Sequence, residues 1–226
     1  MLGELVYCSG GDGKLRRQER YGLTVLRVEV RPGGWGEAGR LKRVFRRMSR
    51  FGVRRVLVPG NFRHGELLLR WGLEPVDPVP FLRACAGSLA LAALRREGIM
   101  PQQGTVSLRG RRVERDMVRA AEFLCPRVRD VAVAAPVGGG DLAAWLRREF
   151  GAPIRPDSGE IPVAVRFDGT GAMEGRRVLS LFGSEPGLAG ICLRAAALAP
   201  EDQEKLPLMA SLWEAGRGDR LGLEFT

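Results

Sequence analysis

The sequence predicts an α/β protein with a Rossmann-like parallel sheet, because strand-like and helix-like segments alternate through its middle. Between Thr105 and Ile154 the chain runs through an apolar strand, an amphipathic helix, the apolar strand Asp130–Ala135, a glycine loop, a second helix and a short last strand. Alternation at this spacing is typical of one βαβαβ half of a doubly wound sheet. A chain of 226 residues, 45% of them hydrophobic, can bury a core of that size.

A similar unit is predicted upstream of residue 100. Leu23–Val30 and Val53–Pro59 have the apolar patterning of strands, and Gly39–Phe51 has apolar residues at the i, i+3, i+4, i+7 spacing of a helix. A short strand at Leu5–Cys8, followed by Asp12–Gly13, predicts an N-terminal hairpin because both central residues of a type I′ turn need positive φ.

The two units resemble each other in sequence. Val28–Arg31 matches Val106–Arg109, and Val53–Val58 matches Val128–Val133, at offsets of 78 and 75 residues. One interpretation is a duplicated βαβα unit, and the other is that any two such units converge on similar patterning. In either case we expect the strands around Val56 and Val131 to be neighbours in a single sheet.

The sequence divides into three predicted parts, residues 1–100, 101–156 and 157–226. A buried, Ala-rich helix at Phe81–Glu97 and the breaker-containing stretch Gly98–Gly104 mark the first boundary. In the third part, Ile161–Phe167 and Val178–Phe182 are separated by a glycine-rich stretch, which favours an antiparallel pair packed on the same core. The other elements predicted there are helices at Leu188–Leu198 and Glu201–Ala215 and a closing strand at Leu221–Phe225.

Composition restricts the classes of partner. The net charge of +10 suggests binding to nucleic acid, and its densest basic stretch is the face Arg40–Arg55. That face lacks aromatic residues for base stacking, and the excess of 33 Arg over 3 Lys also fits a bias in genomic base composition. No apolar run is long enough to cross a bilayer, so we expect a cytoplasmic protein without membrane partners.

Cysteine and histidine usage gives no metal site. The four cysteines are scattered without a Cys-x-x-Cys pair, which favours buried, reduced thiols. His64 is the only histidine, so a His-rich zinc site is excluded and any histidine-dependent catalysis has to use that residue.

Ligands of open α/β sheets bind beyond the carboxyl ends of the strands, and two predicted loops there could contact an anion. Gly138, Gly139 and Gly140 allow close backbone approach to a phosphate, although Asp141 is expected to be the N-cap of the next helix and to compete with it. Arg109, Arg111 and Arg112 could clamp a phosphate or carboxylate. The dinucleotide-binding motif G-x-G-x-x-G (the fingerprint) requires three glycines after the first strand and an acidic residue at the end of the next strand. Only one of the glycines is present after Arg109, and the acidic residue is missing. A conventional NAD site is therefore not expected, and the cofactor stays unknown.

The most varied polar cluster lies between Gly60 and the next helix. Asn61, Arg63 and His64 are predicted ligand contacts, with His64 and Glu66 as candidate catalytic groups in which Glu66 orients the imidazole. The alternative is a surface loop in which Gly60–Asn61 makes a turn and Glu66 caps a helix, since no nucleophile is close in sequence.

Three hypotheses about function follow. The first is a protein that binds a nucleotide or phosphorylated small molecule in a cleft where Gly60–Glu66 and Pro136–Asp141 converge, with or without catalysis. The second is a nucleic-acid-associated module that uses the Arg40–Arg55 face. The third is a non-catalytic scaffold or regulatory protein with a degenerate cofactor site. Neither the oligomeric state nor the presence of an enzyme can be read from the residues.

Overall fold

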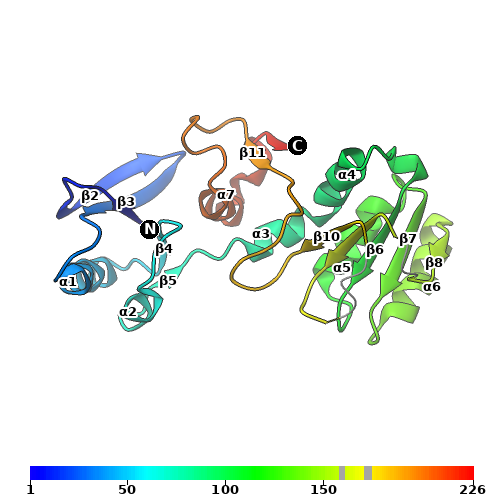
Figure 1. Cartoon of the computed structure of the whole chain (residues 1–226), viewed down its shortest axis with the longest axis horizontal. Coiled ribbons are helices and arrows are strands. Elements are labelled where there is room, and N and C mark those ends of the chain that lie inside the picture. The colour runs from blue at the N-terminus through cyan, green and yellow to red at the C-terminus, as the bar shows by residue number, and fades with distance from the viewer. Residues whose placement is uncertain (158–160, 171–174) are drawn as a thin grey trace. The chain divides into compact units, whose positions relative to one another are not determined.

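The computed structural model describes residues 1–157, 161–170 and 175–226, and they form two compact units (Figure 1). The first unit consists of Met1–Asp77 and Lys205–Arg220, and the second of Pro78–Glu204 and Leu221–Thr226. The chain therefore passes from the first unit to the second at Asp77–Pro78 and not near residue 100, and residues 157–226 contribute to both units. No helix in the described residues is long and apolar enough to cross a bilayer.

The fold is α/β, but its parallel strands form two sheets. Val56 lies in β4 (Arg55–Leu57) of the first sheet, and Val131 lies in β7 (Asp130–Ala134) of the second, so the expected single sheet is wrong. The first sheet ends at the two-residue strand β5 (Glu74–Pro75). A proline has no N–H to give to a further strand, and the prolines that follow start a helix instead of another strand.

In the first unit the strand order is β2-β3-β1-β4-β5. The strands β1 (Leu2–Tyr7), β3 (Leu23–Val30), β4 and β5 are parallel, and only β2 (Asp12–Arg20) is antiparallel to its neighbour β3. The hairpin therefore joins β2 to β3 through Tyr21–Gly22, whose φ values are 51° and 76°. The predicted turn at Asp12–Gly13 is wrong because Asp12 pairs with Val30 at the start of β2.

The helix predicted at Gly39–Phe51 is present as α1 (Glu37–Arg50), and its apolar stripe is buried as expected. Together with α2 (Gly65–Leu69) it covers one face of the first sheet. The core between them is formed by Leu5, Leu26, Val28, Val30, Leu41, Val44, Phe45, Met48, Val53, Val56, Leu68 and Leu73.

The second unit has the strand order of a Rossmann domain. Its sheet runs β10-β9-β6-β7-β8, with β6 (Thr105–Arg109), β8 (Ile154–Arg155), β9 (Val163–Arg166) and β10 (Arg177–Ser180) all parallel to β7. Numbered within the unit, this order is 3-2-1-4-5 when read from β8, which is the order of dinucleotide-binding sheets. Its helices are α3 (Val79–Ala84), α4 (Ala86–Arg96), α5 (Arg115–Leu124) and α6 (Gly139–Phe150), with a 3₁₀ turn η1 (Pro101–Gln103).

The two strands after residue 160 do not form the expected antiparallel pair. Val163–Arg166 are all buried, as in a central parallel strand, and β9 pairs in parallel with both β6 and β10. Part of the glycine-rich connection between them, residues 171–174, lies outside the described residues.

The remaining C-terminal elements are shorter than predicted. The expected helix at Leu188–Leu198 is wrong, because Ala189 and Gly190 have positive φ and are followed by the strand β11 (Leu193–Ala195). That strand pairs antiparallel with β12 (Leu223–Phe225), which confirms the closing strand. The last helix begins only at α7 (Leu206–Leu212) and continues as η2 (Trp213–Arg217) and η3 (Gly218–Arg220).

The proposed duplication is not reflected in the topology. The matched strands β6 and β7 are neighbours, whereas their counterparts β3 and β4 are separated by β1. The sequence correspondence therefore stops at local patterning, which fits the convergence interpretation better.

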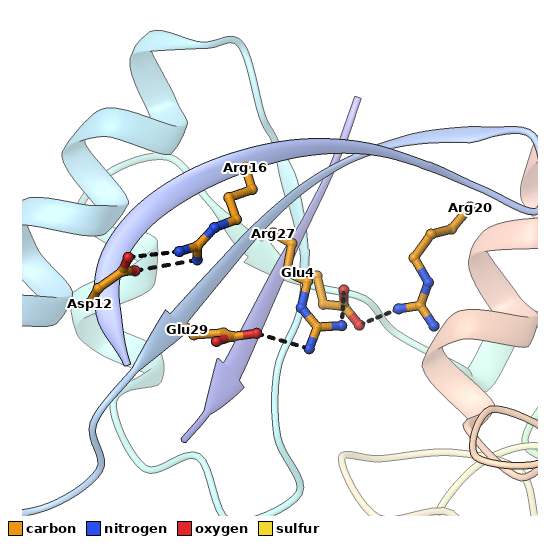
Figure 2. Close-up of polar contacts among 6 residues, drawn as sticks. All are labelled: Glu4, Asp12, Arg16, Arg20, Arg27 and Glu29. Atoms are coloured by element: carbon orange, nitrogen blue, oxygen red, sulfur yellow. Dashed lines mark hydrogen bonds and ion pairs between the residues drawn. The ribbon is translucent and has the colours of Figure 1, made fainter. Parts of the chain in front are cut away.

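Charged side chains form a network on the strands of the first sheet (Figure 2). The carboxylate of Glu4, only 8% exposed, lies 2.8 Å from Arg20 and 3.6 Å from Arg27, and Arg27 also contacts Glu29 at 3.2 Å. These residues come from β1, β2 and β3, so the network joins three strands by charge. Removing one partner of a buried pair leaves the other charge uncompensated.

We therefore expect Glu4→Gln to lower the free energy of unfolding by about 2 kcal/mol. Asp12→Asn is the matched control, because Asp12 pairs with Arg16 at the surface, where solvent screening weakens an ion pair. Urea unfolding measures both variants, and hydrogen exchange of the β1 amides places the change in the first unit. Equal losses for both variants would contradict this role of Glu4.

Candidate functional site

The candidate site of the second unit lies where the strand order reverses, between β6 and β9. Arg109 and Arg166, the last residues of these strands, are register partners and both are nearly fully buried. The loops after β6, β7 and β9 meet beyond them, at the edge where ligands of open α/β sheets bind.

The backbone amides that would hold a pyrophosphate are bonded to the protein itself. The N–H groups of Gly110 and Val113 donate to the carbonyl oxygens of Ala134 and Val137, at 3.1 and 2.9 Å. The N–H of Arg111 donates to Oδ2 of Asp168 at 2.6 Å. The carboxylate of Asp168 therefore accepts a backbone N–H of the loop after β6, which is the kind of donor that binds a phosphate oxygen in a dinucleotide site.

Asp168 is fixed as an anion by several donors. Burial raises the pKa of its carboxyl group, but hydrogen bonds from the Thr170 hydroxyl and from the backbone N–H groups of Arg111 and Thr170 more than offset burial, so that the pKa is lowered overall. A group of this kind stabilises the fold above its unfolded pKa and loses that contribution as the pH falls through its folded pKa. Asp168 is therefore charged, and bound internally, at neutral pH.

Gly110 permits the tight packing of this loop. A Cβ atom at Gly110 would lie 3.0 Å from Cε of Met117 on α5 and 3.3 Å from Oδ2 of Asp168. The other two fingerprint positions are occupied by Arg112 and Arg115. The single glycine thus lets the loop pack closely against α5 and against the carboxylate of Asp168.

A pocket of about 670 Å³ lies beside this loop. It is lined by Gly110, Arg111, Ala134, Ala135, Pro136 and Thr170. Its wall at the end of β7 is therefore apolar, and its polar groups come from the loops after β6 and β9. A volume of this size is in the range of small-molecule sites.

The three predicted clamp residues are placed differently from one another. Arg109 is 2% exposed, and its guanidinium donates to Oγ of Ser107 at 3.1 Å and to Asp157 at 2.8 Å. Arg111 and Arg112 are exposed in the loop, and only Arg111 lines the pocket. The buried guanidinium of Arg109 therefore pairs with Asp157, and Arg109 does not belong to the loop that carries the other two arginines.

The glycine loop lies at the start of α6, with Gly138 at the N-cap in the left-handed region and Gly139 and Gly140 in the first turn. Asp141 is also inside that turn and makes no capping hydrogen bond, so its predicted N-cap role is wrong. Its charge still suits the helix dipole. Gly138 and Asp141 line a second, shallower hollow of about 370 Å³ beside Trp145.

In the first unit, His64 does belong to a polar cluster. Its Nε2 lies 3.3 Å from Oε1 of Glu37, and the same oxygen accepts a hydrogen bond from the Tyr7 hydroxyl at 2.9 Å. Oε2 of Glu37 accepts the N–H of Gly33 at 2.6 Å. Tyr7 ends β1, Glu37 starts α1 and His64 precedes α2, so the cluster also lies at the carboxyl edge of parallel strands.

Two residues of this cluster, Tyr7 and Glu37, could not be identified from the sequence near His64. The orienting carboxylate of His64 is Glu37, whereas the side chains of Glu66, Asn61 and Arg63 are exposed and make no hydrogen bond or ion pair in the described chain. The sequence signal for Glu37 is its position, because it follows the glycine-rich loop that comes after a strand. It was readable only once β1 and β3 were known to be neighbours.

The electrostatics of the cluster favour a protonated tyrosine beside a charged carboxylate. Burial, together with the hydrogen bond to Glu37 and its negative charge, raises the pKa of Tyr7 to about 12. The Tyr7 hydroxyl, the Gly33 N–H and His64 lower the pKa of Glu37 against the opposing effect of burial. Glu37 can thus orient His64 for proton transfer, while Tyr7 stays neutral.

Other predicted features are placed as follows. Gly60–Glu66 belong to the first unit and Pro136–Asp141 to the second, so a shared pocket stays a prediction.

The four cysteines are free and half-buried, less buried than expected, and burial raises the pKa of Cys85 to about 12 and of Cys125 to about 11.

Comparisons with known proteins give likeness to solved structures only. No protein-family model matches the chain, and no curated protein matches it. L-Tryptophan dehydrogenase from Nostoc punctiforme is 14% identical with a TM-score of 0.32, over 64% of this chain and 44% of that one. Shikimate 5-dehydrogenase from Listeria monocytogenes, in complex with shikimate and NAD, is 11% identical with a TM-score of 0.30, over 67% and 61%.

Quinate dehydrogenase from Corynebacterium glutamicum, in complex with NAD, is 12% identical with a TM-score of 0.29, over 98% of this chain and 85% of that one. The chain thus spans less than two thirds of the first two proteins and most of the third. Likeness at these values supports no conclusion about a ligand or a reaction of this chain.

The Tyr7–Glu37 contact can be tested by phenolate absorbance. The chain has two tyrosines, so Tyr21→Phe leaves Tyr7 as the only one, and we expect its ionisation midpoint near 12. Because the raised pKa favours the protonated form in the folded state, its stabilising effect is complete below pH 10 and is lost as the pH rises through about 12.

In the same background Glu37→Gln removes the neighbouring charge, so the midpoint should fall, yet stay above 10 because burial is the largest cause of the shift. Glu66→Gln is the control and should leave the midpoint unchanged. A Tyr7 midpoint of 10, or one insensitive to Glu37→Gln, would show that the contact does not form.

Proposed function

We propose that the second unit binds a nucleotide or a phosphorylated small molecule in the pocket at the carboxyl ends of β6 and β7. The observation that carries this proposal is the position of the pocket, which lies at the ligand-binding edge of a sheet with Rossmann strand order. The Rossmann-type architecture by itself assigns no activity, so the proposal concerns binding and not a reaction.

The lining restricts the kind of nucleotide. Ala134, Ala135 and Pro136 offer an apolar wall for a base, and no carboxylate follows β7 to accept a ribose 2′-hydroxyl. Arg111 stands at the rim, where a guanidinium suits a phosphate on the ribose. We therefore favour a ribose-phosphorylated mononucleotide, such as adenosine 2′-monophosphate, over NAD.

The pyrophosphate of NAD has little to bind here. The N–H groups of Gly110, Arg111 and Val113 already have acceptors, so these backbone groups are not available to a pyrophosphate. This arrangement is also what supports the alternative of a degenerate cofactor site on a scaffold protein. The two alternatives differ in whether the pocket beside the loop binds anything.

We keep His64 as the candidate acid–base group of the first unit, with Glu37 in place of Glu66 as the orienting carboxylate. The support is the 3.3 Å separation of Nε2 and Oε1 and the additional hydrogen bonds that fix Glu37. Asn61, Arg63 and Glu66 are retained only as exposed neighbours that a ligand could contact. No substrate follows from this geometry.

Calorimetric titration of the full chain with adenosine 2′-monophosphate, AMP and NAD⁺ tests the proposal. We expect the 2′-phosphate to bind best and NAD⁺ to bind no more tightly than AMP. Arg111→Ala should weaken binding of the 2′-phosphate about tenfold, because a charge-assisted hydrogen bond is worth about 1.4 kcal/mol or more.

Arg119→Ala is the matched control, because Arg119 is an exposed arginine on α5 that does not line the pocket. It removes the same charge and should leave the dissociation constant within about twofold. Absence of binding by all three nucleotides would favour the scaffold alternative. Equal effects of Arg111→Ala and Arg119→Ala would exclude Arg111 as a specific contact.

A further inference from the structure

A separate pocket of about 380 Å³ lies entirely within the first unit. One wall is the side of α1 that carries the arginines of the lining, and the other is formed by the start of β2 with the loop before it. The residues that matter for its chemistry are Gly11, Gly13, Lys14, Arg40, Arg43 and Arg47.

The pocket has a large excess of positive charge. Arg40, Arg43 and Arg47 are spaced at i, i+3 and i+7, which places them along one side of α1. Lys14 adds a fourth cation from β2. Neither Lys14 nor any of these arginines forms an ion pair in the described part of the chain.

The only acidic residue of the lining is Asp12, and it is already neutralised. Its carboxylate accepts two hydrogen bonds from the guanidinium of Arg16, at 3.3 and 2.7 Å (Figure 2). It also accepts the backbone N–H of Lys14 at 2.9 Å. Arg16 does not line the pocket. The ion pair of Asp12 is thus made with a group outside the pocket, and of the four cations in the lining only Lys14 is also attracted by its charge.

Arg40 makes more side-chain hydrogen bonds than the other cations of the pocket. Its Nη2 donates to the carbonyl oxygens of Arg31 and Gly33, at 3.1 and 2.8 Å, which fixes the guanidinium against the loop after β3. Its Nε is buried and has no hydrogen-bond partner among the described residues. Burying a donor without an acceptor is costly, so this atom calls for a ligand oxygen or water.

The opposite wall depends on two glycines. A Cβ at Gly11 would lie 2.6 to 2.8 Å from backbone atoms of Val30 and Arg31, so only glycine lets the loop pack against the end of β3. Gly13 has φ +66°, a conformation that glycine adopts without strain. Gly11 and Gly13 thus leave part of the wall that faces the arginines as bare backbone, beside the side chains of Asp12 and Lys14.

We propose that this pocket binds a small phosphoryl anion, either inorganic phosphate or a phosphate monoester. Guanidinium groups match phosphate oxygens in geometry and charge, and several of them around one concavity favour a dianion over chloride or a single carboxylate. The proposal does not depend on the function proposed for the second unit, because no residue is shared. It also differs from the expected nucleic-acid face, since it requires only the arginines that line the pocket.

Calorimetric titration of the full chain with inorganic phosphate and with glycerol phosphate tests this site, and the second titration separates the ester from the free ion. The double variant Arg43→Gln/Arg47→Gln should weaken binding at least about tenfold. The matched control Arg46→Gln/Arg50→Gln removes the same charge from exposed positions of the same helix that do not line the pocket. It should change the dissociation constant by less than about twofold.

Circular dichroism of both double variants verifies that α1 is retained. No heat with either anion would overturn the proposal. Equal weakening by the two double variants would also overturn it, because binding would then follow the charge of the whole helix, as for a nucleic-acid backbone. Loss confined to Arg43→Gln/Arg47→Gln supports the pocket, and tighter binding of glycerol phosphate than of phosphate identifies the ligand as an ester.

Discussion

Backbone N–H and C=O groups that follow the carboxyl ends of parallel strands lie beyond the hydrogen-bond pairing of the sheet. The rest of this structure depends on which groups bond to them. In the second unit Asp168 accepts the N–H of Arg111, and Arg83 donates to the carbonyl oxygens of Phe167 and Leu181. In the first unit Glu37 accepts the N–H of Gly33, while Arg40 donates to the carbonyl oxygen of the same residue. Side chains of the protein thus occupy much of the edge where a cofactor usually binds.

Several of the many arginines have a structural role, because they bond to groups of the protein itself. Arg40, Arg83 and Arg166 donate to backbone carbonyl oxygens, and the buried Arg109 forms an ion pair with Asp157. The planar guanidinium, with several donors in a fixed fork, suits this task better than a lysine ammonium. A high net charge therefore does not by itself indicate a nucleic-acid surface in this chain, and the exposed arginines of α1 have to be considered by position.

Local periodicity was sufficient for the amphipathic helix α1 and for the buried strands in the middle of the chain. It failed for the helix expected at Leu188–Leu198 and for long-range pairing. The apolar stripe of α1 and the strands β6 and β7 follow from residue patterns within each segment. The insertion of β1 between β3 and β4 does not, because register depends on contacts between segments far apart in sequence. The same holds for the site, where His64 is oriented by Glu37, 27 positions away, and the Arg111 amide is bonded by Asp168, 57 positions away.

The first unit is discontinuous in the chain. Its last segment, Lys205–Arg220, contributes an ion pair between Glu214 and Arg55 and a hydrogen bond from Arg217 to the carbonyl oxygen of Gly22. During synthesis these partners emerge only after the whole of Pro78–Glu204 has left the ribosome. The N-terminal sheet therefore lacks this segment until the intervening residues have been synthesised, and the second unit in turn is completed only by the last residues, Leu221–Thr226.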